Sequence, residues 1–406
     1  MALHAVSRRG FLVTGGALVA WNHMPKPAQA AASRDPRFVF VNLRGALDGL
    51  AAVAPYGDPS YEKIRDGLIL PLDGPQPAVK LDDMFALHPA MKTLAALYAD
   101  KQAIIVHAAA SPYRERSHFD GQDVLESGFG GVGRVSTGWL NRATGAIPKG
   151  ERINPVSAIS VGAEVPLVMR GKAPVVTWLP VGFPPASDNT RDRLLAIYNH
   201  TDAELANRFN EALSVDRTAS DPNMAGKPGQ PKRPDAGTFR EAGVAAGKLL
   251  ARDDGPRIGS MSFLGWDTHA NEKPVDGQLN KLLGSLDAAI EGLKSEMASV
   301  WHETVIVVAT EFGRTARMNG TLGTDHGTGT VAFIVGGAVK GGRVVADWPG
   351  LAEAKLYQNR DLAPTTDLRA IFKGLLHEHV GLDEKVLASD IFPDSAKVKP
   401  ITGLVA

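Results

Sequence analysis

The sequence predicts an α/β protein in which a mostly parallel β-sheet lies between two layers of helices. Short apolar runs recur along the chain, and the first of them, residues 38–43, is continuous and rich in residues that favour strands. Segments with the 3.6-residue apolar spacing of amphipathic helices lie between these runs. Strands that alternate with helices are typical of a parallel sheet that is covered on both faces.

These elements follow one another regularly. The predicted strands are residues 38–43, 104–109, 157–161, 174–179, 258–264, 304–310 and 331–335. The predicted helices are residues 84–99, 118–125, 188–198, 239–251, 279–300 and 367–377, with another helix opened by a capping box at Thr201 and Glu204. Residues 214–237 are rich in proline, glycine, lysine and aspartate without periodicity, which predicts a flexible excursion.

The N-terminus has the three parts of an export signal. Arg8 and Arg9 precede a short, weakly apolar stretch at 10–21, and an Ala-Gln-Ala tripeptide follows at 28–30. Paired arginines ahead of such a stretch favour the twin-arginine route over the general secretory route. The alternative is an ordinary first helix that carries an arginine pair by chance.

We therefore predict a signal peptide at residues 1–30 and one α/β domain at 31–406, located in the periplasm or outside the cell. The twin-arginine translocase is the expected partner during export. The apolar stretch is shorter than the roughly 20 residues that a membrane helix needs, and no later segment is long and apolar enough. We expect no stable membrane insertion.

Composition excludes two classes of function. The chain has no cysteines, so it has no thiolate metal site. Removal of the signal takes three basic residues and no acidic ones from the 44 of each, which leaves a net charge of −3. A slightly acidic domain is a poor partner for nucleic acid, which attracts basic surfaces.

Polar and charged side chains cluster in the loops beside five of the predicted strands. Ligands of open α/β sheets bind beyond the carboxyl ends of the strands, so we expect these loops to meet at one edge. The residues at this edge that can bind a metal ion are Asp48, Asp267, His269, Glu311, Asp325 and His326. Carboxylates with imidazoles and without thiolates suit a divalent ion such as Zn²⁺, Mn²⁺ or Ca²⁺.

Each of these motifs also has a purely structural interpretation. Asp267-Thr268-His269 can be the capped entry to a helix. Asp325-His326, which lies between glycines, can be a simple turn. The convergence of several such motifs at matching strand ends favours the metal site.

The chain resembles the bacterial family called domain of unknown function 1501. The resemblance covers nearly the whole predicted domain and rests on Leu-Arg-Gly-x-x-Asp-Gly-Leu at 43–50, Ser-His-Phe-Asp-x-Gln-Asp at 117–123, Gly-Trp-Leu-Asn-Arg at 138–142, Asp-Thr-His-Ala at 267–270, Glu-Phe-Gly-Arg at 311–314 and Gly-Thr-Asp-His-Gly at 323–327. Ala46 stands where the family usually has a second glycine. The family is grouped with the alkaline phosphatase-like superfamily, which includes sulfatases, and this implies an alkaline phosphatase-like fold.

The resemblance also implies roles for the metal ligands. Asp48 is similar to the first-strand metal aspartate, and Asp267 with His269 to the Asp/His pair of the other metal, which the superfamily usually spaces further apart. Glu311 lies where the superfamily has Asp-His, with Phe312 in place of the histidine. His326 is similar to the final histidine. In an alternative register, Asp325 and His326 form the Asp-His pair.

The superfamily's nucleophile is a hydroxyl at the start of the helix after the second strand. Ser117 fits that place, with Ser111 as the second choice. His118 is the expected neighbour that orients the site, and Arg314 is the arginine expected to bind an oxyanion, together with Arg44, Arg114 and Arg116. The alternative for Ser117 is a plain helix N-cap, and His118 can equally be a solvated surface residue.

These observations lead to two hypotheses about function. The first is a metal-dependent hydrolase of phosphate or sulfate esters, which acts on a small anionic ester or on a sulfated or phosphorylated polymer. The second is a non-catalytic binding or assembly protein of the periplasm that retains the fold, which Phe312 in place of a histidine favours. A phosphomutase is a weaker third possibility, because its usual substrates are cytoplasmic.

Overall fold

The computed structural model describes residues 35–133, 135–147, 158–162, 165–178 and 236–406, with scattered positions between 194 and 210. Residues Pro36–Ala406 form one compact unit. The predicted signal at 1–30 lies outside the described residues, as do most of the excursion at 214–237, most of the helix at 188–198 and the capping box at Thr201. Within the described part of the chain, no helix is both long and apolar enough to cross a bilayer.

A large mixed sheet forms the centre of this unit. Its main path is β11 (Arg343–Val345), β5 (Ala103–Ala110), β10 (Thr330–Val335), β9 (Thr304–Thr310), β1 (Arg37–Arg44), β8 (Ile258–Leu264), β6 (Ala158–Val161) and β7 (Val175–Trp178), while β12 (Thr366–Asp367) also pairs with β5. The pairings are parallel except for the two that β10 makes with β5 and β9. The prediction of a mostly parallel sheet is confirmed. A small second sheet contains β2 (Val53–Ala54), β4 (Ala86–Leu87) and β3 (Val79–Lys80).

The alternation of side chains along β1 explains why both faces of the sheet are covered. Phe38 and Phe40 belong to the apolar core on one face, and Val39 and Val41 belong to the core on the other. All four side chains are at most 1% exposed. A strand with apolar residues at both odd and even positions must be buried on both faces. This is the pattern of a central parallel strand.

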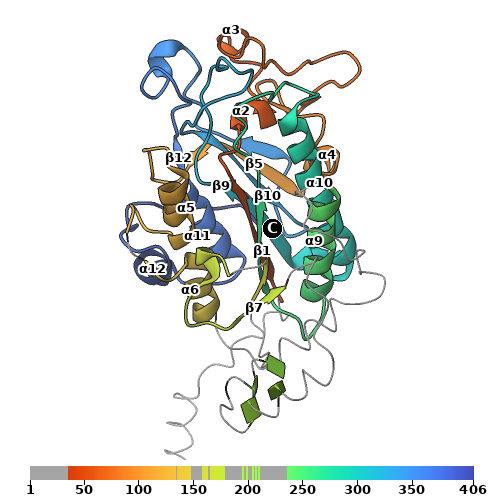
Figure 1. Cartoon of the computed structure of the whole chain (residues 1–406), viewed down its shortest axis with the longest axis vertical. Helices are drawn as coiled ribbons and strands as arrows, with labels where there is room; N and C mark the ends of the chain where they lie inside the picture. The colour runs from red at the N-terminus through yellow and green to blue at the C-terminus, as the bar shows by residue number, and fades with distance from the viewer. Residues whose placement is uncertain are drawn as a thin grey trace, which may run out of the picture. The chain divides into compact units, whose positions relative to one another are not determined.

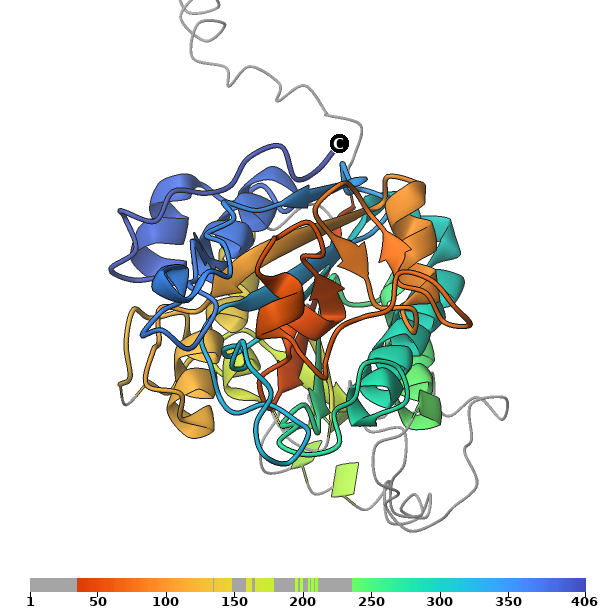
Figure 2. The same cartoon turned by 90° about the horizontal axis from the view of Figure 1, so that it is seen from above.

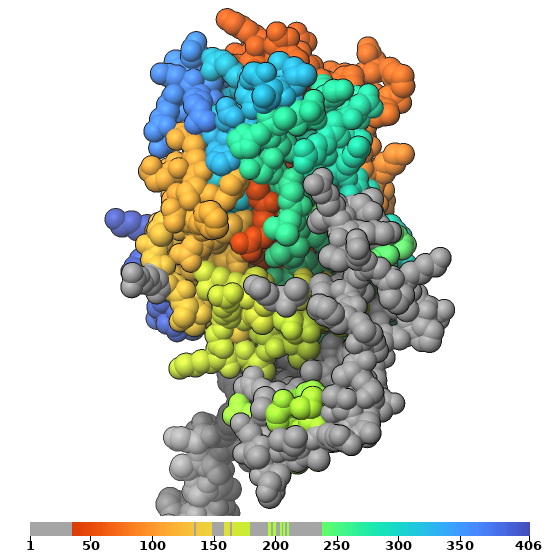
Figure 3. Space-filling view, viewed as in Figure 1, coloured from red at the N-terminus to blue at the C-terminus, as the bar shows by residue number. Residues whose placement is uncertain are grey.

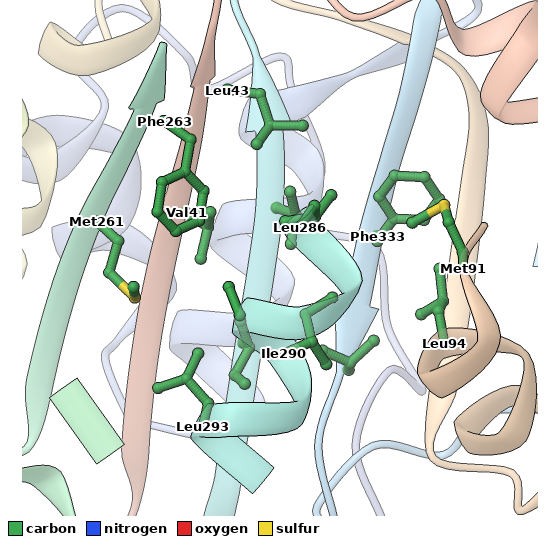
Figure 4. Packing of buried hydrophobic residues seen from close by; sticks show 14 of the residues in the cluster. Val41, Leu43, Met91, Leu94, Met261, Phe263, Leu286, Ile290, Leu293 and Phe333 are labelled. Atoms are coloured by element: carbon green, nitrogen blue, oxygen red, sulfur yellow. The ribbon is translucent and has the colours of Figure 1, made fainter. Parts of the chain in front are cut away.

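One layer of helices contains α4 (Lys92–Ala99), α9 (Ala236–Leu250) and α10 (Gln278–Glu296). These helices lie to the right of the sheet in Figure 1 and on the same side in the view from above in Figure 2. Leu286, Ile290 and Leu293 of α10 follow the helical repeat and pack toward Val41 of the sheet (Figure 4). Burial of each such side chain contributes about 1.5–3 kcal/mol to folding.

The opposite layer contains α5 (His118–Ser127), α6 (Trp139–Ala146) and α11 (Leu368–Glu378). They lie on the other side of the sheet in both views (Figures 1 and 2). Trp139 stacks on Phe372 with 4.8 Å between ring centres and meets the edge of Phe40 at 5.3 Å. The short helices α2 (Gly49–Ala52), α3 (Tyr61–Ile64) and α12 (Glu384–Val386) lie in the connections.

The prediction of one helix over 84–99 is wrong in its first half. Ala86 and Leu87 instead form β4, which pairs with β2, and α4 begins only at Lys92. Pro89 accounts for this break, because a proline disfavours helical geometry at the residue before it. The helix predicted over 279–300 also ends early, at Glu296. A separate 3₁₀ segment (Ala298–Glu303) follows it.

Candidate metal centre

Four segments bring polar side chains together at the edge of the sheet where the parallel strands end. His118 is the first residue of α5, which follows β5, and Asp267 and His269 follow β8. Glu311 follows β9 directly. Because β10 runs antiparallel to its neighbours, its beginning lies at this same edge, and His326 precedes it.

Three histidine nitrogens and one carboxylate oxygen converge there. The Nε2 atom of His326 lies 3.0 Å from the Nε2 atoms of both His118 and His269. The Oδ1 atom of Asp267 lies 3.0 Å from Nε2 of His269, 3.2 Å from that of His326 and 3.4 Å from that of His118. His118, Asp267 and His326 form a His/Asp/His cluster that can hold a metal ion.

The other nitrogen of each ring faces an oxygen atom that accepts a hydrogen bond. The three pairs are His118 Nδ1 with Glu311 Oε1 at 2.8 Å, His269 Nδ1 with Asp325 Oδ1 at 3.2 Å, and His326 Nδ1 with the backbone oxygen of Arg116 at 2.9 Å. With a proton held on Nδ1 of each ring by these acceptors, the Nε2 lone pairs would face a bound cation. Without a cation, protons on Nε2 of His118 and His326 are donated to Asp267 instead. Oxygen acceptors behind imidazole ligands are the usual support of a metal site.

The charges around the cluster are strongly coupled. Hydrogen bonds with Asp267 and Glu311 raise the pKa of His118 to about 9 and outweigh its burial, which lowers it. Burial alone raises the pKa of Asp267, but hydrogen bonds from His118, His326 and Arg314 outweigh burial and hold the pKa well below the usual range. The centre is therefore built around a carboxylate that stays ionised and attracts positive charge.

The donor set fits a divalent ion of the zinc type. A tetrahedral ion with bonds of about 2.0–2.1 Å separates its ligand atoms by roughly 3.4 Å. The separations measured from Asp267 Oδ1, 3.0 to 3.4 Å, are close to that value. Three imidazole nitrogens disfavour Ca²⁺, which takes six to eight oxygen ligands.

The centre is open to solvent. The side chains of His269 and Asp267 are 45% and 41% exposed, and those of His118 and His326 are each 27% exposed. Figure 3 shows residues near the end of β1 (red) in a recess between the orange segment with α5 and the green-to-teal segment after β8. A ligand from solution can therefore reach the four donor atoms.

The structure brings five of the six predicted metal-binding residues together. Asp267, His269 and His326 contribute donor atoms, while Glu311 and Asp325 lie behind His118 and His269 as hydrogen-bond acceptors. Asp48 lies apart from the cluster, because its buried carboxylate accepts a bond from the Ala51 amide as the N-cap of α2 and pairs with Arg65 at 2.8 Å.

The predicted catalytic residues have different surroundings. Ser117 is the N-cap of α5, and its hydroxyl accepts from the Asp120 amide at 3.5 Å. Arg314 is 1% exposed, and its guanidinium donates to Asp267 Oδ1 at 2.6 Å and to Thr324, so it faces the centre from below. His118 contributes an Nε2 atom to the cluster. Its place beside a strand end was the signal in the sequence that could have identified it as a ligand.

Phe312 stacks on His118 with 5.0 Å between ring centres and an interplanar angle of 22°. Its buried ring packs against the face of the imidazole and limits how the imidazole can turn. Phe312 therefore packs against one residue of the His/Asp/His cluster.

Solved structures with a similar fold are remote in sequence. The protein Ps i-CgsB, solved in complex with a neocarrahexaose, is 10% identical with a TM-score of 0.43, over 90% of this chain and 77% of that one. A protein of the alkaline phosphatase superfamily from Vibrio parahaemolyticus is 11% identical with a TM-score of 0.35, over 74% and 60%. The phosphonate monoester hydrolase of Agrobacterium radiobacter is 12% identical with a TM-score of 0.33, over 86% and 74%. These proteins resemble the chain in fold alone.

No curated protein matches the chain significantly. One protein family matches residues 35–391, which include the strands of the sheet and all the residues of the centre. The chain therefore belongs to the family described as Protein of unknown function (DUF1501).

Proposed function

We propose that the protein is an exported, metal-dependent hydrolase of phosphate or sulfate esters that works with a single divalent ion. The observation that carries this proposal is the convergence of His118, Asp267, His269 and His326 at a solvent-open strand edge. Active sites of α/β sheets are built at this edge. Zn²⁺ or Mn²⁺ suits the three nitrogen donors better than Ca²⁺.

A divalent ion in the centre would polarise an ester oxygen and lower the pKa of a coordinated water. The chain supplies guanidinium groups that can hold an anionic substrate beside it. Arg360 donates to the backbone oxygen of His326 at 2.7 Å and keeps a side chain that is 41% exposed. Arg44, which is 35% exposed, pairs with Glu126 through one Nη atom at 2.9 Å and keeps its other donors. Guanidinium groups bind tetrahedral oxyanions through paired hydrogen bonds.

Ser117 remains the candidate nucleophile, since its hydroxyl lies at the N-terminus of α5 and directly precedes the ligand His118. A helix N-terminus favours the negative charge that develops on an attacking oxygen. If the ion itself activates water, Ser117 serves only as an N-cap. Loss of the Ser117 hydroxyl would abolish turnover if Ser117 is the nucleophile, but not if it is only an N-cap.

A specific observation favours the second candidate, a non-catalytic binding or assembly protein. Four protein side chains reach the centre, and four protein ligands are typical of structural zinc sites, whereas catalytic sites have three and an open position. Arg314, which was expected to bind an oxyanion, is fully buried. In this alternative the ion would fix a surface for a carbohydrate polymer or a protein partner.

Metal analysis combined with an ester panel separates the candidates. The native protein should carry about one equivalent of divalent metal and hydrolyse at least one aryl phosphate or sulfate, and Asp267→Ala should lose both properties. His377→Ala is the matched control, because this partly exposed histidine lies on α11 away from the centre. Stoichiometric metal without activity on any ester would support the binding protein, and a metal-free native protein would exclude both.

Export by the twin-arginine route is part of the proposal and rests on Arg8 and Arg9 in the sequence. The double substitution Arg8→Lys and Arg9→Lys should retain the precursor in the cytoplasm, as measured by fractionation of whole cells. Arg134→Lys is the control for a basic residue outside the signal. Normal export of the double variant would show that another route is used.

A further inference from the structure

A closed ring of buried hydrogen bonds lies beneath the centre. Arg314 donates to Asp267 Oδ1 at 2.6 Å and to Thr324 Oγ1 at 3.2 Å. The Thr324 hydroxyl donates to Glu272 Oε2 at 2.7 Å, and the Thr268 hydroxyl donates to the same oxygen at 3.1 Å. Thr268 follows Asp267 in the chain, which closes the ring.

Apart from Asp267, whose side chain is 41% exposed, the members of this ring are inaccessible to water. Thr268, Glu272 and Thr324 are each 0% exposed, and Arg314 is 1% exposed. Buried hydrogen bonds of a carboxyl group are costly to remove, because no water can replace the missing partner. The ring therefore behaves as one rigid unit rather than as four separate contacts.

The two loops joined by the ring have no common backbone ladder at the sheet. Asp267 and His269 follow β8, and His326 precedes β10, while β1 and β9 lie between those two strands. Links between the two loops therefore help to fix His326 relative to Asp267, in addition to the bonds that tie the His326 loop to Arg314 and Thr315. Such links include the Thr324 amide, which donates to the Thr268 oxygen at 3.1 Å, and the two hydroxyls that share Glu272.

We propose that Glu272 is a positioning residue that holds these two ligand loops together and thereby sets the affinity of the centre for its metal ion. The inference rests on the proposed metal centre. Glu272 touches none of the donor atoms and acts through Thr268 and Thr324. Supporting contacts of this kind typically change metal affinity by about 10–100-fold.

The surroundings of Glu272 show what a replacement must provide. Beneath it lies the buried pair of Asp48 and Arg65, joined at 2.8 Å. Burial and the charge of Asp48 raise the pKa of Glu272, and its Oε2 atom accepts the two hydroxyls. Glutamine keeps an acceptor oxygen for these hydroxyls, and leucine has none. Asp48, expected as a ligand from the sequence, is instead a buried neighbour of Glu272.

Binding of Zn²⁺ to metal-stripped full-length protein, measured by chelator competition, tests the inference. We expect Glu272→Leu to weaken Zn²⁺ binding by about 10–100-fold, and Glu272→Gln to remain within about threefold of the parent. Thr324→Val, which removes one hydroxyl without changing shape, should weaken binding by a smaller factor and provides a variant that folds if Glu272→Leu does not.

The matched control is Asp287→Leu. Asp287 is also a buried carboxylate that joins two segments, since it accepts from the amides of Thr93 at 2.8 Å and Leu94 at 2.9 Å, but it lies on α10. The Asp287→Leu substitution should lower the melting temperature without changing the Zn²⁺ affinity. Equal affinity of the parent, Glu272→Leu and Thr324→Val would overturn the inference alone. A parent that binds no Zn²⁺ would overturn the metal centre and the inference with it.

Discussion

The Nε2 atoms of His118 and His326 lie 3.0 Å apart although Glu311 and the Arg116 backbone oxygen accept from the opposite sides of the two rings. Two imidazoles that both present a lone pair cannot hydrogen-bond to each other. Either an extra proton or a metal ion must lie between them. Hydrogen bonds with the acidic residues Asp267 and Glu311 raise the pKa of His118 to about 9 when no metal is bound.

Removal of one donor should abolish tight metal binding. His326 contacts both other rings and Asp267, so His326→Ala should lower Zn²⁺ affinity by more than the roughly 100-fold expected for loss of a supporting contact. Elemental analysis of the purified variant and a chelator titration measure the effect. A variant that retains one equivalent of metal would show that the ion binds elsewhere.

The two carboxylates behind the histidines should differ in importance. Glu311 is 0% exposed and Asp325 has a side chain that is 52% exposed. Glu311→Gln should weaken Zn²⁺ binding by about 10-fold or more, because no water can replace the charged acceptor of His118. Asp325→Asn should change it only about twofold, since water can accept from His269. Calorimetric titration of both variants measures the ranking, and the reverse order would contradict it.

Gly45 allows the loop after β1 to pass close to the Asp267 loop. A Cβ atom at Gly45, where φ is +122°, would lie 2.6 Å from the Asp267 amide nitrogen. Gly45→Ala should therefore lower both stability and metal affinity. Gly74→Ala is the matched control, because φ is +92° there and nothing lies within 4 Å of the added Cβ. It should cost only the backbone strain, about 1–2 kcal/mol, and leave the affinity unchanged.

Stability should fall in mild acid because His107 is buried in its neutral form. Its Nε2 donates to the Val53 oxygen at 2.9 Å, and its Nδ1 accepts from the Ala108 amide at 2.8 Å. Burial lowers the pKa of His107 from 6.5 to about 4. In the unfolded chain, His107 therefore binds a proton below about pH 6.5. In the folded chain it binds that proton only below about pH 4.

The contribution of His107 is therefore complete above pH 6.5 and disappears as the pH falls toward 4, a loss of about 3 kcal/mol. Denaturant unfolding at a series of pH values measures it. His107→Gln, which keeps a donor and an acceptor, should show a shallower decline over this range. A decline as steep as in the parent would mean that other groups cause it.

The sequence indicated the strands, and through them the edge of the sheet at which Asp267, His269 and His326 meet. It could not indicate the direction of each side chain beyond a strand end. At Gly45 and Ala46 the backbone has positive φ values of 122° and 66°, and this turn directs Asp48 to the N-terminus of α2. Its partner Arg65 is the C-cap of α3, a helix that the sequence pattern did not reveal.

Glu272 was missed for a related reason. It occupies a loop without periodicity, and its importance depends on two threonine hydroxyls that meet only in the folded chain. The role of His118 was ambiguous in the same way, because a histidine at a helix start is compatible with a surface position. Contacts between loops of distant strands depend on the complete sheet, whereas strands and helices follow from local pattern.

The position of β1 has a consequence for biosynthesis. β1 precedes every other described strand in the chain, yet its two neighbours in the sheet are β8 and β9, where Phe38 pairs with Ile258 and Val305. Until both have been synthesised, this strand, with its apolar residues 38–41, has two open edges. Nascent chains should therefore depend on chaperones until β8 and β9 have been synthesised, and products of stop codons before β9 should aggregate or be degraded rather than accumulate.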